Sequence, residues 1–128
     1  MILDTSVLIA ILRQEPEAAE FARLIEEHRD VGISVASIVE ATVVVGREGR
    51  RDLDTLLEAL GPEVHAVDRR QLEIARDAWA RFGRGSGSQA RLNFGDCFAY
   101  AAAVARAEPL LFKGNDFPHT DVVDARAR

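Results

Sequence analysis

The chain has 128 residues, of which 48% are hydrophobic and 29% are charged, a size and composition that fit one domain with its own core. Sixteen basic residues against 21 acidic ones give a net charge of −5, which argues against a generic basic coat for nucleic acid. Nucleic acid is not excluded, because carboxylates that bind a metal ion still count as negative in this sum.

Short apolar runs alternate with helical patterns along the first half of the chain. MILDT predicts a strand that ends at Asp4, SVLIAIL predicts a short helix, and EPEAAEFARLIEEH has its apolar residues at helical spacing. ISVAS predicts a second strand, which runs into helical segments over about residues 35–60. Gly46 and Gly49 divide these segments, so we expect a helical hairpin that lies outside the sheet layer.

The second half continues the alternation. EVHAV predicts a third strand, and Asp68 with Gln71 forms a capping-box pattern at the start of a helix. The side chains expected to face inward from that helix are Leu72, Ala75, Trp79 and Phe82. GRGSGSQAR reads as a flexible stretch, NFGDCFAYAAAVA predicts a buried helix that begins at Asp96, and PLLF and VVDA predict the fourth and fifth strands. This order predicts a parallel sheet covered on both faces, an α/β/α sandwich that forms a single domain over residues 1–128.

The sequence also bears on the cellular compartment. Cys97 is the only cysteine, so an internal disulfide and a multi-cysteine zinc site are excluded and a reducing environment is favoured. No signal-peptide pattern is visible at the start, and no run approaches the roughly 20 apolar residues of a membrane span. We therefore expect a cytoplasmic protein that makes no membrane contact.

Four acidic residues fall where the predicted elements begin or end, or within an apolar run. Asp4 ends the first predicted strand, and Asp116 follows the fourth. Ligands of open parallel sheets bind beyond the carboxyl ends of the strands, and a helix that starts at Asp96 and precedes the fourth strand begins at that same edge. Glu40 lies in SIVEATVVV, where a buried carboxylate is costly unless it is neutral, reaches solvent or meets a cation.

Each acid also has an ordinary structural explanation. Asp4 and Asp96 fit helix N-caps, Asp116 fits a turn, and Glu40 fits a solvated helix face. As a set at one edge, however, carboxylates are hard oxygen ligands that suit Mg²⁺ or Mn²⁺ better than zinc. Such ions support phosphodiester hydrolysis, because they lower the pKa of bound water and neutralise charge on the phosphate.

Four stretches resemble, in order and spacing, the PIN-domain ribonucleases, and above all the VapC toxins of bacterial VapBC toxin–antitoxin modules: MILDTSVLIAIL, SIVEA, LNFGDCFAYAAA and LLFKGNDFPHTDV. The resemblance covers nearly the whole chain. It implies a PIN-like sandwich with five parallel strands in the order 3-2-1-4-5. It also implies a toxin with Mg²⁺- or Mn²⁺-dependent endoribonuclease activity, in which metal-activated water cleaves the RNA.

The resemblance carries roles onto individual positions. The matching acids, implied to be catalytic and metal-binding, are Asp4, Glu40, Asp96 and Asp116, the last of which varies more in role. The matching site-supporting positions are Thr5, Ser6 and Asn115. A VapB-type antitoxin that binds the helical segments of residues 16–60 and blocks the site is implied as a partner, together with RNA and a second copy of the chain in a homodimer.

Basic residues near the predicted acidic edge are candidates for RNA contacts. Arg81, Arg84 and Arg91 flank GSGSQ, which is either a solvated loop or a mobile basic flap that contacts RNA phosphates. Lys113 fits either a pair with a carboxylate or a contact with phosphate. A local basic patch would let a chain of negative net charge bind a polyanion.

Two other classes of protein remain alternatives. A receiver-like signalling domain has the same strand pattern, but it requires a phosphoacceptor Asp directly after the third strand. Here that strand ends in His65, Ala66 and Val67, and the following Asp68 reads as a helix cap. The second alternative is a PIN-like domain that binds RNA or protein without cleaving, against which the intact set of acids argues.

Overall fold

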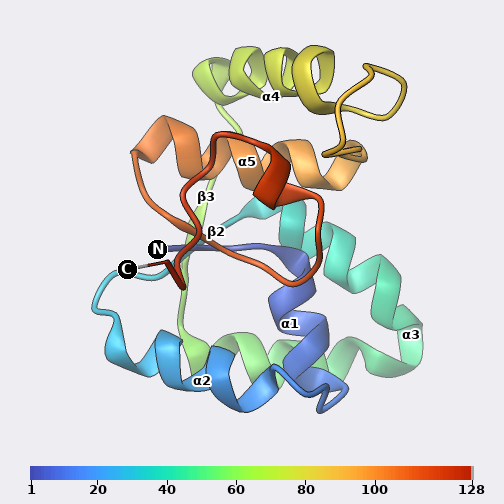
Figure 1. The fold of residues 1–128 in the computed structure, drawn as a ribbon. Helices are drawn as coiled ribbons and strands as arrows, with labels where there is room; N and C mark the ends of the chain where they lie inside the picture. Colours follow the sequence, from blue (N-terminus) through green and yellow to red (C-terminus); the bar gives the residue numbers. More distant parts are fainter. Residues whose placement is uncertain (128) are drawn as a thin grey trace.

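A parallel sheet lies at the centre of the fold, between two layers of helices (Figure 1). This computed structural model describes residues 1–127. The strands are β1 (Ile2–Leu3), β2 (Gly32–Ser34), β3 (Glu63–His65) and β4 (Leu110–Leu111). They form a four-stranded sheet in the order β3-β2-β1-β4, in which every pairing is parallel. The expected order is therefore confirmed for four strands, and the expectation of five strands is wrong.

The segment expected to form the fifth strand lies beside β4 but pairs with it only briefly. The amide of Leu110 donates to the carbonyl of Val123, and the amide of Ala125 donates to the carbonyl of Leu110. A single parallel bridge results. The Asp124 carboxylate then accepts from the Arg126 amide at 2.8 Å, and this local turn ends the pairing before a strand can form.

Helices follow the strands and cover both faces of the sheet. They are α1 (Thr5–Leu12), α2 (Ala18–Glu27), α3 (Val35–Leu60), α4 (Arg69–Phe82) and α5 (Phe94–Arg106), with a short 3-10 helix η1 (Phe117–His119). Figure 1 shows α4 and α5 on one side of the sheet and α1 and α2 on the other. No helix within residues 1–127 has the length and apolar character needed to cross a membrane.

The sheet separates two hydrophobic cores, because neighbouring residues of a strand point to opposite faces. Ile2 and Leu110 pack into a core with the alanine-rich side of α5 and the inner face of α4. Leu3, Ile33 and Leu111 pack into the second core, with α1, α2 and α3. Each two-residue strand thus contributes to both layers, which explains why the strand sequences are apolar without alternation.

The two helical segments expected over residues 35–60 are present, and they meet at a kink within α3. Gly46 adopts φ 72°, a left-handed conformation that glycine tolerates, and this residue kinks α3. Beyond the kink, Leu53 is fully buried in the core shared with α1 and α2. The division expected at Gly46 is therefore confirmed, and the two helices follow each other there without a longer connecting loop.

The face that α4 buries matches the expected one in part, since Ala75 and Phe82 face the core but Leu72 and Trp79 do not. Ala75 and Ala78 are buried against α5, whereas Leu72 is 45% exposed and Trp79 is 48% exposed. Of the two hydrogen bonds expected in the capping box, the structure has the one in which the Asp68 side chain accepts from the Gln71 amide, at 2.8 Å. The Gln71 side chain is buried. Small residues bring α4 close to α5, and this contact leaves the larger side chains at the rim.

Candidate active site

Three of the four predicted acids line one pocket beyond the carboxyl ends of β1 and β2. Asp4 follows β1, Glu40 lies in the second turn of α3, and Asp96 lies in the first turn of α5. The pocket has a volume of about 240 Å³, and its other lining residues are Thr5, Ser6, Ile9, Glu15, Val44 and Lys113. The sequence therefore placed Asp4 and Asp96 at the correct edge of the sheet, and of the two interpretations left open for Glu40, the structure brings its side chain into the pocket.

Asp4 is the N-cap of α1 and is also the most buried acid of the pocket. One carboxylate oxygen, Oδ2, accepts from the Ser6 amide at 3.0 Å and from the Ser6 hydroxyl at 2.6 Å. The other, Oδ1, is buried without a hydrogen-bond partner. Burial raises the pKa of Asp4 from 3.8 to about 6 against the opposing effect of these hydrogen bonds, and the charge of Glu40 adds to the rise.

Asp96 is the third residue of α5 and not its first, so the expected helix start is corrected. Asn93 is the N-cap: its side chain accepts from the Asp96 amide at 2.9 Å, and the Asp96 carboxylate accepts from the Asn93 amide at 3.0 Å. This reciprocal capping box fixes the carboxylate. Burial, followed by the charges of Asp4, Asp116 and Glu40, raises the pKa of Asp96 to about 7.

Glu40 comes close to Asp96 because the residue before Asp96 has no side chain. A Cβ atom at Gly95 would overlap the Glu40 carboxylate. The Thr5 hydroxyl, predicted to support the site, donates to the carbonyl of Ser37 at 3.0 Å and so ties α1 to the first turn of α3. Gly95 was not singled out from the sequence, although a glycine inside a helix start is a signal of close approach.

Ser6 connects the acidic pocket to the end of β4. Its hydroxyl donates to Asp4 and accepts from the backbone amide of Lys113 at 2.9 Å. The Lys113 ammonium pairs with Glu15 at 3.0 Å and Glu17 at 2.9 Å. Lys113 was expected either to pair with a carboxylate or to contact phosphate. The structure shows carboxylate pairs, at the rim of the pocket.

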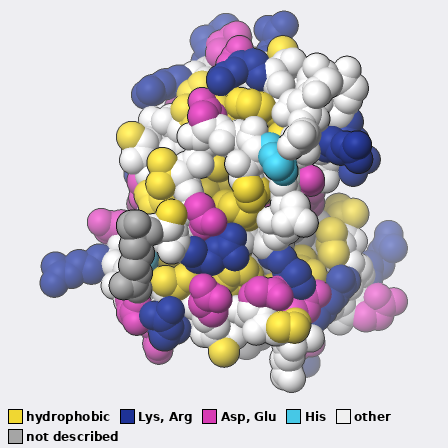
Figure 2. Space-filling model, in the orientation of Figure 1, with side chains coloured by type: hydrophobic (Ala, Val, Ile, Leu, Met, Phe, Trp, Pro, Cys, Tyr) yellow, Lys and Arg dark blue, Asp and Glu magenta, His cyan; other side chains and the backbone are white. Residues whose placement is uncertain are grey.

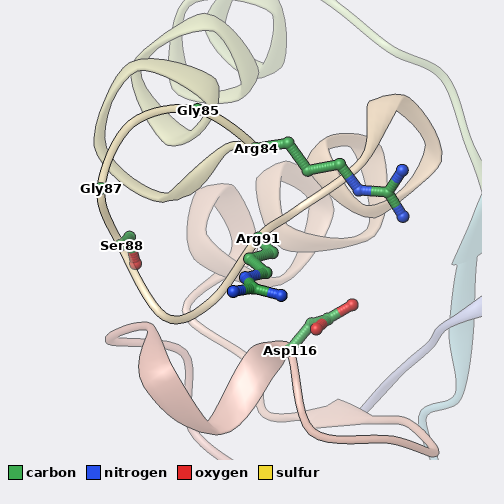
Figure 3. Close-up of a pocket in the computed structure, with 6 residues that line it drawn as sticks. All are labelled: Arg84, Gly85, Gly87, Ser88, Arg91 and Asp116. Atoms are coloured by element: carbon green, nitrogen blue, oxygen red, sulfur yellow. The ribbon is translucent and has the colours of Figure 1, made fainter.

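Asp116 lines a neighbouring cavity of about 790 Å³ instead of the acidic pocket. Figure 3 shows the side chain of Arg91 extending from the loop toward Asp116, while Arg84 extends from the opposite end of the same loop. Within the described residues, neither arginine forms an ion pair. Arg81, in contrast, pairs with Asp77 and Asp121 at 3.3 and 3.4 Å, away from this cavity. Asn115 is exposed and lines neither space.

The arginine loop of residues 83–91 is internally hydrogen-bonded and not merely a flexible stretch. Its ends pair through a bridge between Gly83 and Leu92. The Ser86 hydroxyl donates to the Gly83 carbonyl at 2.6 Å, and the Ser88 hydroxyl accepts from the Ala90 amide at 3.1 Å. On the face drawn in Figure 2, basic and acidic side chains are interspersed, so a polyanion would meet local charge and no broad basic surface.

The pocket suits a divalent cation in its chemistry. Within residues 1–127, no three Asp, Glu, His or Cys side chains come close enough to one another to form a metal centre. The pocket nevertheless offers carboxylate oxygens, the ligands that Mg²⁺ and Mn²⁺ prefer. The buried Oδ1 of Asp4 lacks a donor, and burial, with a smaller effect of the neighbouring acids, raises the pKa values of Asp4 and Asp96. A cation would relieve both conditions, so the residues fit such an ion.

Comparison with known proteins defines the family. The PIN domain model matches residues 1–123, and the chain belongs to the PIN-domain family. Ribonuclease VapC28 of Mycobacterium tuberculosis is 48% identical over 132 residues, which cover 100% of this chain and 99% of that protein. Ribonuclease VapC42 of the same species is 40% identical over 95% of this chain and 96% of that protein. These relatives place the chain, within the PIN-domain family, among the VapC ribonucleases.

Solved structures with the same fold agree with this assignment. VapC20 of Mycobacterium tuberculosis, described as a sarcin-ricin loop cleaving toxin, superposes with a TM-score of 0.73 at 16% identity and covers 96% of each chain. A toxin–antitoxin complex from Klebsiella pneumoniae gives a TM-score of 0.68 at 16% identity, covering 91% of this chain and 88% of that chain. At this identity, the likeness supports the fold alone.

Proposed function

We propose that this VapC-family chain is the toxin of a toxin–antitoxin pair and cleaves RNA at the acidic pocket with the help of Mg²⁺ or Mn²⁺. The observation that carries the proposal is the buried, unpartnered Oδ1 of Asp4 in a pocket shared with Glu40 and Asp96. Whole-chain identity to VapC ribonucleases supports the ribonuclease activity. A receiver-like domain is disfavoured by the PIN-domain match.

In this proposal the protein holds the ion and positions the substrate. Asp4, Glu40 and Asp96 would hold the ion, which when bound supplies an acidified water and neutralises phosphate charge. Ser6 keeps the Asp4 carboxylate in one orientation through two hydrogen bonds. The backbone amide of Asn93 orients the Asp96 carboxylate through one hydrogen bond. Asp116 is assigned a supporting electrostatic role, because its charge reaches Asp96 while its side chain lines the neighbouring cavity.

The test is a cleavage assay on structured RNAs with purified protein and Mn²⁺ or Mg²⁺. We expect cleavage by the wild type, loss of cleavage in EDTA, and loss of cleavage in Asp96→Asn. Asp68→Asn is the matched control, because Asp68 also binds a backbone amide at a helix start but lies outside the pocket. Cleavage that survives Asp96→Asn or ignores EDTA would contradict the proposed role of the acids.

We assign the antitoxin to the outer face of α3. Four valines are exposed there, with Val39 at 60% and Val43 at 75%, one helical turn apart. Val44 lines the acidic pocket, so a segment docked on this face would reach the acids. Expression of the chain should arrest growth, and a co-expressed antitoxin should relieve the arrest. Val39→Glu should weaken that relief, and unchanged relief would move the antitoxin elsewhere.

We also propose that the 1–128 domain forms a homodimer. The exposed apolar side chains on the described surface are consistent with association. Light scattering on the purified chain should give twice the 14.1 kDa mass of one copy. A single-copy mass at micromolar concentration would reject this part of the proposal.

A further inference from the structure

An exposed aromatic groove lies between α4 and the start of α5, beside the candidate active site. Its lining includes Leu72, Ala75, Trp79, Phe94, Cys97 and Phe98, and its volume of about 990 Å³ is at the top of the range of roughly 300–1,000 Å³ typical of ligand pockets. Phe94 is 79% exposed, and Trp79 is 48% exposed. Large aromatic side chains held open to water on a monomer mark a binding surface.

The first turn of α5 links the aromatic groove to the acidic pocket. Asn93 lines the groove and binds the Asp96 carboxylate through its amide. Phe94 lines the groove next, and Gly95 then packs against the Glu40 carboxylate. A ligand that rests on Phe94 therefore lies beside the residue that contacts Glu40 and two residues before Asp96.

The aromatic groove also joins the arginine loop. Arg84 lines both the groove and the cavity that contains Arg91 and Asp116 (Figure 3). The other charged groups of the groove form ion pairs. A guanidinium nitrogen of Arg76 lies 3.9 Å from a carboxylate oxygen of Glu73, and one of Arg81 lies 3.3 Å from a carboxylate oxygen of Asp77. Arg84 forms no ion pair within residues 1–127. The groove thus combines flat apolar faces with one available guanidinium.

We propose that the aromatic groove stacks an unpaired base of the RNA, while Arg84 binds a phosphate next to that base. The inference rests on the proposed ribonuclease function and names the feature of the substrate that the chain reads: a single-stranded segment with a base turned outward. Aromatic rings stack on any base face, and an adjacent arginine neutralises the backbone. Bases inside a duplex are stacked on each other and cannot enter the groove.

A nucleotide suits this groove better than a protein segment does. The groove offers flat rings and a guanidinium in one lining, which match a base and its phosphate, and Phe94 lies two residues before Asp96 of the acidic pocket. Phe98 meets the Phe94 ring edge-on with centroids 4.9 Å apart, and this contact supports Phe94 from below while the ring itself remains 79% exposed.

The test measures binding in EDTA, so that cleavage does not interfere. Trp79 is the only tryptophan of the chain, and its fluorescence should be quenched when a short single-stranded oligoribonucleotide binds, but not when the same sequence is in a duplex. Phe94→Leu keeps an apolar side chain without the flat ring and should weaken single-strand binding roughly 5- to 150-fold, the range that one stacked base supplies. Phe94→Trp should retain binding.

Val104→Ala is the matched control, since Val104 is a partly exposed apolar residue at the other end of α5. Circular dichroism should show that each variant is folded, as expected for changes at exposed positions. Wild-type affinity and unchanged quenching in Phe94→Leu would overturn the proposal. So would loss of dimerisation, or of antitoxin binding, in Phe94→Leu with RNA affinity unchanged, because the groove would then be a protein interface.

The outcome is separable from that of the proposed function. If the wild type cleaves RNA with Mn²⁺ and Phe94→Leu binds and cleaves RNA equally well, the groove assignment fails and the ribonuclease assignment stands. If the wild type neither binds nor cleaves any RNA, both fail.

Discussion

The acidic pocket and the arginine loop meet at the same edge of the sheet but are built in opposite ways. The pocket carboxylates lie at the starts of helices, where backbone amides and Ser6 hold Asp4 and Asp96 in place. The loop is held by its own serines and presents Arg84 and Arg91 to solvent. Groups on rigid helices keep a fixed geometry, which metal binding requires. Exposed groups on a loop contribute charge, which does not depend on a fixed geometry.

This contrast predicts a ranking of mutational effects. Buried acids influence one another strongly, because water screens little of their repulsion. Exposed arginines act on a ligand through a screened field, and each contributes little alone. Changes in the pocket should therefore alter activity and stability together, and removal of an arginine side chain from the loop should mainly alter RNA affinity.

The largest effect is expected for Asp4→Asn in the cleavage assay with Mn²⁺. Loss of a carboxylate proposed to hold the metal ion should reduce the cleavage rate by roughly a thousand-fold, which corresponds to about 4 kcal/mol. Asp116→Asn should cost about ten-fold, because Asp116 lines the neighbouring cavity and affects the site through its charge. Equal losses of cleavage rate in Asp4→Asn and Asp116→Asn would show that Asp116 is as important as the acids of the pocket, and would contradict its supporting role.

The second effect is a pH dependence of stability in EDTA. The pKa of Asp4 is about 6 in the folded chain against an ordinary value of 3.8, so its ionised form is disfavoured by folding. This penalty is absent below about pH 4 and complete above about pH 6, and stability should therefore fall as the pH rises through this window. A rise of about two pKa units gives an upper bound of about 3 kcal/mol.

Asp4→Asn should remove that part of the pH dependence and should be more stable than the wild type at pH 8 in EDTA. Denaturant titrations at pH 4, 5, 6, 7 and 8 measure both proteins. Mn²⁺ should then stabilise the wild type more than the variant, because binding to the folded state adds to its stability. A wild type that becomes more stable between pH 4 and pH 7 in EDTA would contradict the burial argument.

A third effect concerns the contact that brings the acids together. Gly95→Ala places a methyl group where the Glu40 carboxylate lies, and overpacking of this kind typically costs about 1–3 kcal/mol. Because Glu40 is displaced, cleavage should also be lost. The double variant Gly95→Ala/Glu40→Ala should recover most of the stability and none of the activity. Additive losses of stability in the double variant would show that the methyl group clashes elsewhere.

How much of this site the sequence predicts depends on the kind of signal that each residue leaves. Apolar runs locate strand ends, so the sequence predicts the edge at which Asp4 and Asp96 lie, whereas for Glu40 it leaves a solvated helix face and a site equally open. Helix starts depend on hydrogen bonds that several residues can supply. The spacing of Asn93 and Asp96 contains the capping box, but an aspartate alone fits an N-cap equally well. The glycine at position 95 signals a close approach, but the sequence does not show that the neighbour is Glu40.

The exposed aromatic groove illustrates a second limit. Helical periodicity predicts that α4 has one apolar side, but not which part of that side reaches the core. Ala75 and Ala78 allow close packing on the small residues of α5, so Trp79 is left 48% exposed at the rim. A large apolar residue such as Trp79 is expected to be buried, but the close contact between α4 and α5 leaves no space for it.

The smallest effect is expected at Arg91, in the arginine loop. Its backbone φ of 51° is left-handed, which is uncommon for a residue with a side chain, and the guanidinium extends toward Asp116 (Figure 3). Arg91→Ala and Arg91→Gly should both weaken RNA binding about three- to ten-fold and reduce the salt dependence of binding by about one phosphate contact.

The two Arg91 variants should differ in stability, because only glycine adopts a positive φ without steric cost. Arg91→Gly should be more stable than Arg91→Ala by about 0.5–1 kcal/mol in thermal or denaturant unfolding, while their RNA affinities stay equal. Such a result would show that the Arg91 side chain contributes to RNA affinity, whereas its positive φ affects stability. If Arg91→Ala instead binds RNA with the wild-type salt dependence, the loop contributes no phosphate contact, and the positive charge that meets the substrate must come from Arg84.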